Sequence, residues 1–324
     1  MGNNVDKVAK TDQNKFIVFV INPLLRTNRL RRTIPDESRA RTRKYISSDT
    51  REFGLMRYLN GQELRDFIKE RQAHQVRGLI QHFKVQPRLA IIQTKQDRVT
   101  DLYTRLKQEY GEDIRIVVDL HKVDQEQVPA LITNLNNDSK IKGIVVQLPL
   151  VNPAETDAIA NLVDSKKDVD GLGKDASWDS ATAVAINWLL AGYNVELTGR
   201  KIAIVGCGRL VGRPLLKMWR KSGYDVTSLD NSCQDLTSEL EDKDVIVTAT
   251  GVPGLIKPSM LKKNAVVVDA GVADDHGRVV GDLDNSIYSR DDLTITPTKG
   301  GVGPLTIAAL MDNVIRASYP PTAE

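Results

Sequence analysis

Three glycines at positions 206, 208 and 212 follow a short apolar run and have a spacing that suits phosphate binding. Residues 202–205 are apolar and include β-branched types, which predicts a strand, and the residues from Leu210 onward predict a helix with Gly212 in its first turn. A strand, a glycine turn and a helix bring a pyrophosphate against free N–H groups at a helix N-terminus. Because the spacing is GxGxxxG rather than GxGxxG, an ordinary tight turn in an α/β domain is the alternative.

Four polar residues are expected where ligands bind in open α/β sheets, beyond the carboxyl ends of the strands. Gln147 ends a predicted strand, and Asp170 lies in the turn after the next helix. Tyr103 and Lys107 lie on the helix that follows an earlier strand. Each has a simpler interpretation, as a solvated lysine, a packing tyrosine or a turn aspartate. Their shared location nevertheless favours a common site.

The elements that must position these residues alternate between strand and helix, which implies parallel sheets with helices on their faces. In the first half we expect helices at 61–83, 99–110, 128–135 and 154–163, and strands at 89–92, 114–118 and 144–147. In the second half we expect strands at 202–205, 226–229, 245–248, 265–269 and 293–296. A helix at 181–190 is expected to bridge two domains, and Pro304 suits the first position of the last helix.

The amino-acid composition limits the classes of function that the protein can have. A chain of 324 residues with 41% apolar content favours two medium-sized cores, and a net charge of +3 gives no argument for a nucleic-acid or membrane partner. Two cysteines, Cys207 and Cys233, suit a reducing cytosol, and the scattered histidines argue against a metal site. No apolar run approaches the roughly 20 residues of a membrane helix. We therefore expect a soluble cytoplasmic protein.

Residues 1–55 differ from the rest, with twelve Lys and Arg against six acids. This composition predicts a disordered extension, with a nucleic-acid arm as the alternative. Because periodic patterning begins near Met56, deletion of residues 1–55 is expected to leave folding and turnover nearly unchanged. The melting temperature and the specific activity of the truncated protein check this, and a large drop in melting temperature would mean that the segment packs on the core.

Six segments occur in a fixed order from Tyr103 to Thr306: YTRLK, VVQLPL, KKDVDG, IVGCGRLVGRP, VVGDLD and KGGVGPLT. Together they resemble the methylenetetrahydrofolate dehydrogenase/cyclohydrolase family, over roughly residues 56–318. The resemblance implies an α/β fold of two domains, one binding folate and the other a Rossmann-like NAD(P)-binding domain. Residues 56–178 and 301–320 are then assigned to the folate-binding domain, and 179–300 to the nucleotide-binding domain.

The resemblance also implies roles for particular residues. Tyr103 and Lys107 match the tyrosine and the catalytic lysine of YxxxK, and Gln147 matches the glutamine of VQLPL. Asp170 matches the second aspartate of KDVDG, which holds the pterin. The loop that closes over the folate matches four residues: Gly301, Val302, Gly303 and Pro304. Contacts with the cofactor are expected from nine residues: Gly206, Cys207, Gly208, Arg209, Val211, Gly212, Asp230, Thr250 and Gly251.

The predicted cofactor preference is for NAD over NADP. Members of the family commonly have GRS at the turn, where arginine and serine help to hold the 2′-phosphate of NADP, whereas this chain has Cys207 and Gly208. Asp230 ends the second strand of the nucleotide unit, about 20 residues after the glycine turn, where an acid commonly binds the ribose hydroxyls of NAD. The alternatives are that Asp230 is only a turn residue and that Arg209 or Arg213 supplies a replacement charge.

The function implied is oxidation of 5,10-methylenetetrahydrofolate to the methenyl form, with hydrolysis of that product to 10-formyltetrahydrofolate. The family also implies a homodimer. Ser180–Ala183 replaces the usual PCTP, and residues 297–301 replace PVPGG, so the balance of the two activities is open. The alternatives are a dehydrogenase-only enzyme, a dehydrogenase of a shikimate-type acid, and a non-catalytic folate- or nucleotide-binding protein.

Overall fold

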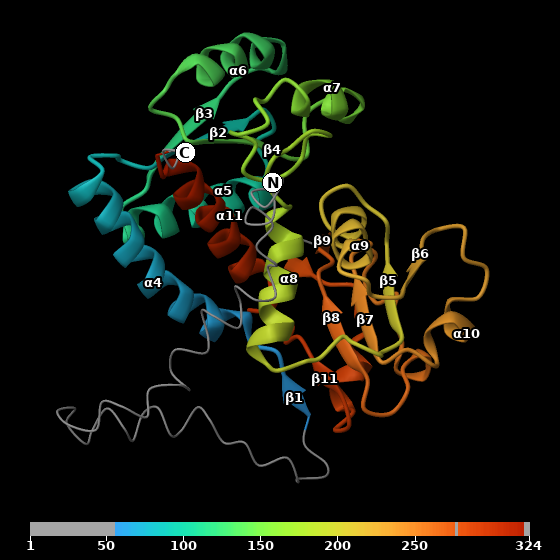
Figure 1. Cartoon of the computed structure of the whole chain (residues 1–324). Coiled ribbons are helices and arrows are strands. Elements are labelled where there is room, and N and C mark those ends of the chain that lie inside the picture. The colour runs from blue at the N-terminus through green and yellow to red at the C-terminus, as the bar shows by residue number, and fades with distance from the viewer. Residues whose placement is uncertain (1–55, 276–277, 321–324) are drawn as a thin grey trace, which may run out of the picture. The chain divides into compact units, whose positions relative to one another are not determined.

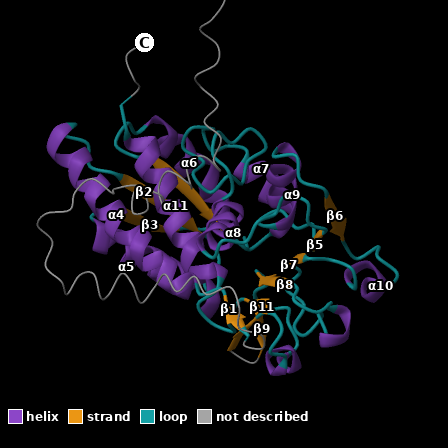
Figure 2. Ribbon diagram, turned by 60° about the horizontal axis from the view of Figure 1, so that its bottom comes forward, coloured by secondary structure: helices purple, strands orange, loops and turns teal. Residues whose placement is uncertain are grey.

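Two parallel β-sheets organise the chain in the computed structural model, which describes residues 56–275 and 278–320 (Figure 1, Figure 2). Met56–Glu324 forms one compact unit. The predicted extension at residues 1–55 lies outside the described residues.

The first sheet has three strands in the order β3-β2-β4. They are β2 (Arg88–Gln93), β3 (Val117–Lys122) and β4 (Gly143–Gln147). Alternate residues of β2 enter two different hydrophobic clusters, Leu89 and Ile91 on one face and Ala90 and Ile92 on the other. Both faces are therefore covered, as expected of a parallel sheet.

Helices and short 3-10 turns flank this sheet. They are α5 (Arg98–Ile114), η1 (Gln125–Gln127), α6 (Val128–Asn137), η2 (Pro153–Glu155) and α7 (Thr156–Ala160). The cluster with Ala90 and Ile92 takes further members from α6, α7 and β4, including Ile132, Ile159 and Ile144.

The second sheet has six parallel strands in the order β1-β11-β8-β7-β5-β6. They are β1 (Arg57–Tyr58), β5 (Ile202–Val205), β6 (Val226–Leu229), β7 (Val245–Thr248), β8 (Val266–Asp269) and β11 (Thr294–Ile295). Val205 pairs with Leu229 and with Thr248, so the carboxyl ends of β5, β6 and β7 meet at one edge. The predicted cofactor contacts follow these strand ends.

Four further short elements and an antiparallel hairpin complete this half. They are α9 (Gly212–Lys221), α10 (Leu236–Leu240), η3 (Pro258–Met260), η4 (Asn285–Ser289) and the hairpin of β9 (Ala273–Asp275) and β10 (Arg278–Val280).

Three long helices join the two sheets through one hydrophobic cluster. They are α4 (Gly61–His82), α8 (Ala181–Gly192) and α11 (Val302–Ser318). The cluster contains Val76 of α4, Ile186 of α8 and Val314 of α11 together with Ile91 of the first sheet and Ile204 of the second. The two-domain α/β fold is confirmed, and it shares this helical core.

Helices α4 and α11 run side by side in the same direction (Figure 1). At their first residues, a Cβ on Gly61 would lie 1.9 Å from the carbonyl oxygen of Gly301, so no side chain fits there. The N–H of Gln62 donates to Gly300 O at 3.0 Å. At the other end, the rings of Phe83 and Tyr319 meet edge to face with centroids 5.8 Å apart.

Several predicted boundaries need correction. The strand expected at 114–118 is wrong at its start, because α5 continues to Ile114 and Arg115 closes it with a φ of 67°. Ile114 is fully buried and continues the helical stripe of Lys107 and Tyr110, so its apolar character belongs to the helix. The helix expected at 154–163 is two shorter pieces, η2 and α7, and Pro304 is the third residue of α11 rather than the first.

Two features of the fold have no counterpart in the predicted elements. Helix α10 and the β9–β10 hairpin are short and polar, so they carry no periodic apolar signal. Strand β1 pairs with β11 in the second sheet, although residues 57–58 are assigned by the resemblance to the folate-binding domain. Among the described residues, no helix is long and apolar enough to cross a membrane.

Candidate active site

Helix α5 carries Tyr103 and Lys107 one turn apart. Its start is fixed by Asp97, whose side chain accepts hydrogen bonds from the N–H groups of Val99 and Thr100 at 3.1 and 2.9 Å. The buried face of the helix includes Thr100, Thr104 and Lys107. Lys107 therefore lies on the inward stripe, and its interpretation as a solvated helix charge is wrong.

The Lys107 ammonium donates to Gln147 Oε1 at 2.8 Å, and only 8% of the lysine is exposed. Gln147 ends β4, and its own amide nitrogen donates to Leu148 O at 3.1 Å, which orients the oxygen toward the lysine. Burial lowers the pKa of Lys107, and the carboxylate of Asp170 opposes this shift. The structure thus brings Lys107, Gln147 and Asp170 together around an amine that loses its proton more readily than an exposed lysine.

The turn that presents Asp170 is built by its neighbour Asp168, which sequence reasoning missed. Asp168 is 3% exposed and accepts hydrogen bonds from the N–H groups of Leu172 and Gly173 at 3.2 and 2.6 Å. Burial raises the pKa of Asp168, and these N–H groups oppose the rise. The sequence signal was a second aspartate two positions before Asp170 in the same turn.

The C-terminal helix braces the same turn. Asn313 of α11 is 3% exposed and donates to Val169 O at 2.8 Å and to Asp179 O at 3.2 Å. This second residue missed from the sequence ties the Asp170 turn to the helix that begins at the predicted folate loop.

The predicted folate loop lies beside Tyr103. A Cβ placed on Gly303 would be 4.0 Å from the Tyr103 hydroxyl. Burial raises the pKa of Tyr103, so its hydroxyl is protonated at neutral pH and available as a donor. Gly301 is the N-cap of α11, whereas the side chain of Val302 is buried in the shared core, so only its backbone is available to a ligand.

The glycine turn after β5 packs too tightly for side chains at two of its three glycines. Gly206 has a φ of 95°, and a Cβ on Gly212 would lie 1.8 Å from Gly206 O. A Cβ on Gly208 would meet nothing within 4 Å. Val211 is the N-cap of α9, so the turn delivers the chain directly to a helix N-terminus, the arrangement that favours phosphate.

Arg209 is the charged residue of this turn, and it forms an ion pair with Asp157 of α7. This pairing lowers the pKa of Asp157. The hydroxyl of Ser180 donates to Leu210 O at 3.0 Å, so a second contact holds the turn. Arg209 is thus paired with an exposed carboxylate, and a 2′-phosphate would compete with Asp157 for its guanidinium.

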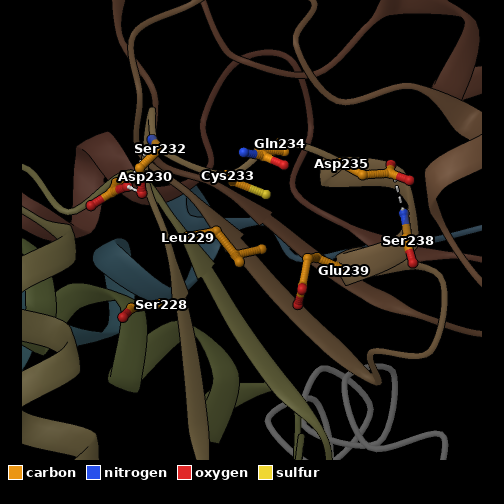
Figure 3. A pocket seen from close by; sticks show the side chains of 9 residues that line it. All are labelled: Ser228, Leu229, Asp230, Ser232, Cys233, Gln234, Asp235, Ser238 and Glu239. Atoms are coloured by element: carbon orange, nitrogen blue, oxygen red, sulfur yellow. Dashed lines mark hydrogen bonds between the residues drawn. The ribbon is translucent and has the colours of Figure 1, made fainter.

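Asp230 lies at the end of β6 and forms one wall of an open hollow of about 410 Å³ (Figure 3). Its Oδ1 accepts hydrogen bonds from the N–H and the hydroxyl of Ser232 at 2.9 and 2.6 Å, and these bonds lower the pKa of Asp230. The other lining residues come from the end of β6, the following loop and α10: Ser228, Leu229, Ser232, Cys233, Gln234, Asp235, Ser238 and Glu239. Asp230 is therefore an ionised carboxylate with one oxygen occupied by its own turn.

Thr250 and Gly251 follow β7 at the same edge of the sheet. The Thr250 N–H donates to Asp282 Oδ2 at 2.7 Å, and Gly251 has a φ of 69°. The VVGDLD segment contributes to the family resemblance, but no role is predicted from the sequence for its Asp282. The described residues contain no group of three or more His, Cys, Asp and Glu side chains suited to a metal ion.

Comparison with known proteins yields two matching family models. The catalytic domain of tetrahydrofolate dehydrogenase/cyclohydrolase matches residues 59–170, and its NAD(P)-binding domain matches residues 180–320. The bifunctional protein FolD of Maridesulfovibrio salexigens is 35% identical over 279 residues, which cover 81% of this chain and 98% of that protein.

Solved structures agree with this match. The bifunctional enzyme FolD of Campylobacter jejuni superposes with a TM-score of 0.76 at 29% identity, covering 81% of this chain and 98% of that one. The FolD of Trypanosoma brucei, solved with NADP and an inhibitor, gives a TM-score of 0.74 at 26% identity over 81% and 97% of the two chains.

Proposed function

The chain belongs to the tetrahydrofolate dehydrogenase/cyclohydrolase family, and from this premise we propose how its own residues serve the two reactions of that family. The first reaction is the NAD(P)-dependent oxidation of 5,10-methylenetetrahydrofolate to 5,10-methenyltetrahydrofolate. The second is the hydrolysis of that product to 10-formyltetrahydrofolate. The family match replaces the alternative of a shikimate-type dehydrogenase.

Folate binding is assigned to Asp170 and to the loop from Gly301 to Pro304. A carboxylate accepts two hydrogen bonds from the amino-pyrimidine edge of a pterin, and Asp170 stands beside Lys107 at the end of the first sheet. The Tyr103 hydroxyl, which lies near Gly303, would contact the same ligand. The proposed folate-binding domain comprises residues 56–178 and 301–320, and the proposed nucleotide-binding domain residues 179–300.

A nicotinamide cofactor fits the carboxyl edge of the second sheet. The space that a Cβ would fill at Gly206 and Gly212 is taken by backbone, so the turn is compact beside the N-terminus of α9, and the hollow at Asp230 lies at the end of the neighbouring strand. When bound, the cofactor accepts a hydride from the methylene carbon of the folate. The chain's contribution to this step is to hold the two ligands against each other, because the resulting cation is shared by two folate nitrogens and needs little acid–base help.

Hydrolysis requires a proton acceptor, and Lys107 is the residue proposed for it. A water molecule forms a C–O bond with the methenyl carbon and gives a proton to the neutral Lys107 amine, which leaves a neutral hydroxyl adduct. One C–N bond of this adduct then breaks with its electron pair going to the departing nitrogen, which gains a proton as the hydroxyl oxygen loses one, and the formyl group is left on the other nitrogen. Gln147 holds the lysine and orients the water. The observation that carries this proposal is a buried Lys107 that donates to Gln147 at 2.8 Å beside Asp170.

An assay with 5,10-methylenetetrahydrofolate and either NAD or NADP tests the whole proposal. Formation of the reduced nucleotide, followed by decay of the methenyl absorbance, is expected. Nucleotide binding without any absorbance change would instead favour the non-catalytic alternative, and reduction without methenyl decay would favour the dehydrogenase-only alternative. The homodimer and the cytoplasmic location are proposed from the same family membership.

The proposed preference for NAD rests on three residues. Cys207 and Gly208 bring neither the charge nor the hydroxyl that hold a 2′-phosphate, and Asp230 adds a carboxylate that repels it. Asp230 Oδ2 makes no hydrogen bond with the described part of the chain, so this oxygen is available to ribose hydroxyls.

Asp230→Ser is expected to lower the ratio of kcat/KM with NAD to kcat/KM with NADP by about tenfold, equivalent to roughly 1.4 kcal/mol. Steady-state kinetics with both nucleotides measure this ratio. Ser232→Ala is the matched control, because the Ser232 N–H still holds the carboxylate at 2.9 Å and the ratio should stay close to that of the wild type. A wild type that prefers NADP, or a ratio that Asp230→Ser leaves untouched, would remove Asp230 as the discriminating residue.

A further inference from the structure

Asp282 is a fully buried carboxylate that neither reaction uses, at the carboxyl edge of the six-stranded sheet. Its Oδ2 accepts hydrogen bonds from the Thr248 hydroxyl at 2.6 Å and from the Thr250 N–H at 2.7 Å. Its Oδ1 is also buried and has no hydrogen-bond partner among the described residues. Burial of a carboxylate with an unsatisfied oxygen costs free energy, which indicates that Asp282 has a function besides packing.

A second carboxylate holds the segment that carries Asp282. Asp269, the last residue of β8, accepts hydrogen bonds through Oδ1 from the N–H groups of Gly271 and Asp282 at 2.9 and 3.1 Å, and through Oδ2 from the Leu283 N–H at 3.1 Å. Asp269 therefore fixes the backbone at 282–283, and Asp282 in turn fixes the backbone after β7. We name these two residues the aspartate clasp.

Two glycines show how closely the aspartate clasp is enclosed. A Cβ on Gly271 would lie 2.0 Å from Asp282 Oδ1, and a Cβ on Gly281 would lie 2.0 Å from Asp269 Oδ2. The Asp282 carboxylate thus lies between the loop after β7, which it holds at Thr250, and the loop after β8, which passes it at Gly271.

The loop after β7 contains the predicted cofactor contacts Thr250 and Gly251, and two short contacts restrain part of it. The Thr250 hydroxyl accepts a hydrogen bond from the Val252 N–H at 3.1 Å, and a Cβ on Gly251 would lie 3.3 Å from Val272 O. Among the described residues, Asp282 is the side chain that accepts a hydrogen bond from the Thr250 N–H. Without it, this loop would have to be ordered at the moment when the cofactor binds, which weakens affinity.

We propose that Asp282 is a positioning residue for the nicotinamide cofactor, which it serves by holding the backbone of residues 250–251 in the binding conformation. This inference rests on the proposed function, because it takes Thr250 and Gly251 as cofactor contacts. It adds a residue that touches neither substrate nor reacting atom, and it gives the buried acceptor oxygen of Asp282 a role in cofactor affinity besides its role in folding.

Titration of the folate-free protein with NADH and with NADPH, followed by the nucleotide's fluorescence, tests this role. Asp282→Ala should raise the Kd of the preferred nucleotide about tenfold, because loss of one hydrogen bond to a charged group corresponds to roughly 1.4 kcal/mol or more. Asp282→Asn should stay within about twofold of the wild type, since its amide oxygen accepts the same two bonds. Hydrogen exchange at the Thr250 amide should accelerate in the alanine variant only.

Asp284→Ala is the matched control, two positions along the same segment. Asp284 accepts a hydrogen bond from the Ser286 N–H at 2.9 Å, caps η4 and pairs with Lys257, so its loss should lower the melting temperature without changing the Kd. If Asp282→Ala does not fold, Thr248→Val removes one of the two donors to Oδ2 and should raise the Kd about threefold.

Three results would overturn the inference. The first is an unchanged Kd in a folded Asp282→Ala or Thr248→Val protein. The second is an equal rise in Kd for Asp284→Ala, which would trace the effect to lost stability. In both cases the wild type still binds nucleotide and the proposed function stands. The third is a wild type that binds neither nucleotide, which would overturn the proposed function together with this inference.

Discussion

Replacing Lys107 with methionine is expected to lower the rate of methenyltetrahydrofolate hydrolysis by about 10²- to 10⁴-fold while nucleotide reduction remains measurable. Only the hydrolytic step needs a proton acceptor, and the Lys107 amine donates to Gln147 Oε1 at 2.8 Å in a buried site. Methionine keeps the length of the side chain and removes its basicity. The two rates, measured separately on methenyl and methylene substrates, give the result.

The pH profile supplies an independent check. Because burial lowers the pKa of Lys107 below its ordinary value of 10.5, the wild-type rate of hydrolysis should rise with pH and level off below pH 10.5, and this rise should be absent in Lys107→Met. A lysine whose pKa is lowered in the fold destabilises the protein at any pH where the unfolded lysine is protonated. The variant's melting temperature at pH 7 should therefore not fall through loss of charge. Equal loss of both activities would show that Lys107 positions substrate rather than accepting a proton.

Gly212→Ala is expected to abolish measurable nucleotide binding. The added Cβ would lie 1.8 Å from Gly206 O, a backbone atom of the same turn, so the turn must open to admit it. Overpacking of this kind costs about 1–3 kcal/mol of stability, and here the distortion falls on the N–H groups that would face the pyrophosphate. Nucleotide titration together with thermal melting measures both effects.

Gly78→Ala is the control for this substitution. Gly78 lies in α4, outside the glycine turn, and a Cβ there meets nothing within 4 Å, so the affinity should remain near that of the wild type and the melting temperature should not fall. If Gly212→Ala binds nucleotide as tightly as Gly78→Ala, the glycine turn is a structural turn and the pyrophosphate lies elsewhere.

The strands of the second sheet were predictable because each apolar run has turn-forming residues at its two ends. The predicted strands at 202–205, 226–229 and 245–248 coincide with β5, β6 and β7. The prediction of a strand at 114–118 failed because its apolar residues are divided in the structure: Ile114 ends the helix, Arg115 is the left-handed cap, and the strand begins at Val117. Apolar residues alone do not show where the periodicity of a helix ends and that of a strand begins.

Some residues of the candidate site could likewise be predicted from the sequence, and others could not. Gln147 was predicted at the end of a strand, Lys107 on the helix after a strand and Asp170 in the turn after a helix. Their roles followed from the family resemblance, and the structure brings these three together. Asp168 and Asp282 were not predicted, because their partners include backbone N–H groups in loops whose course depends on the tertiary fold. Such residues leave no periodic trace in the sequence.

The parallel contact of α4 with α11 has a consequence for synthesis on the ribosome. Gln72 of α4 donates to Ala308 O of α11, a residue 236 positions later in the chain. At the usual elongation rates, the second partner is made roughly 10 to 50 s after the first. During this interval the apolar side of α4 lacks its covering helix, so the nascent chain offers a surface for chaperones, and a message truncated before residue 302 yields a product in which that surface stays uncovered.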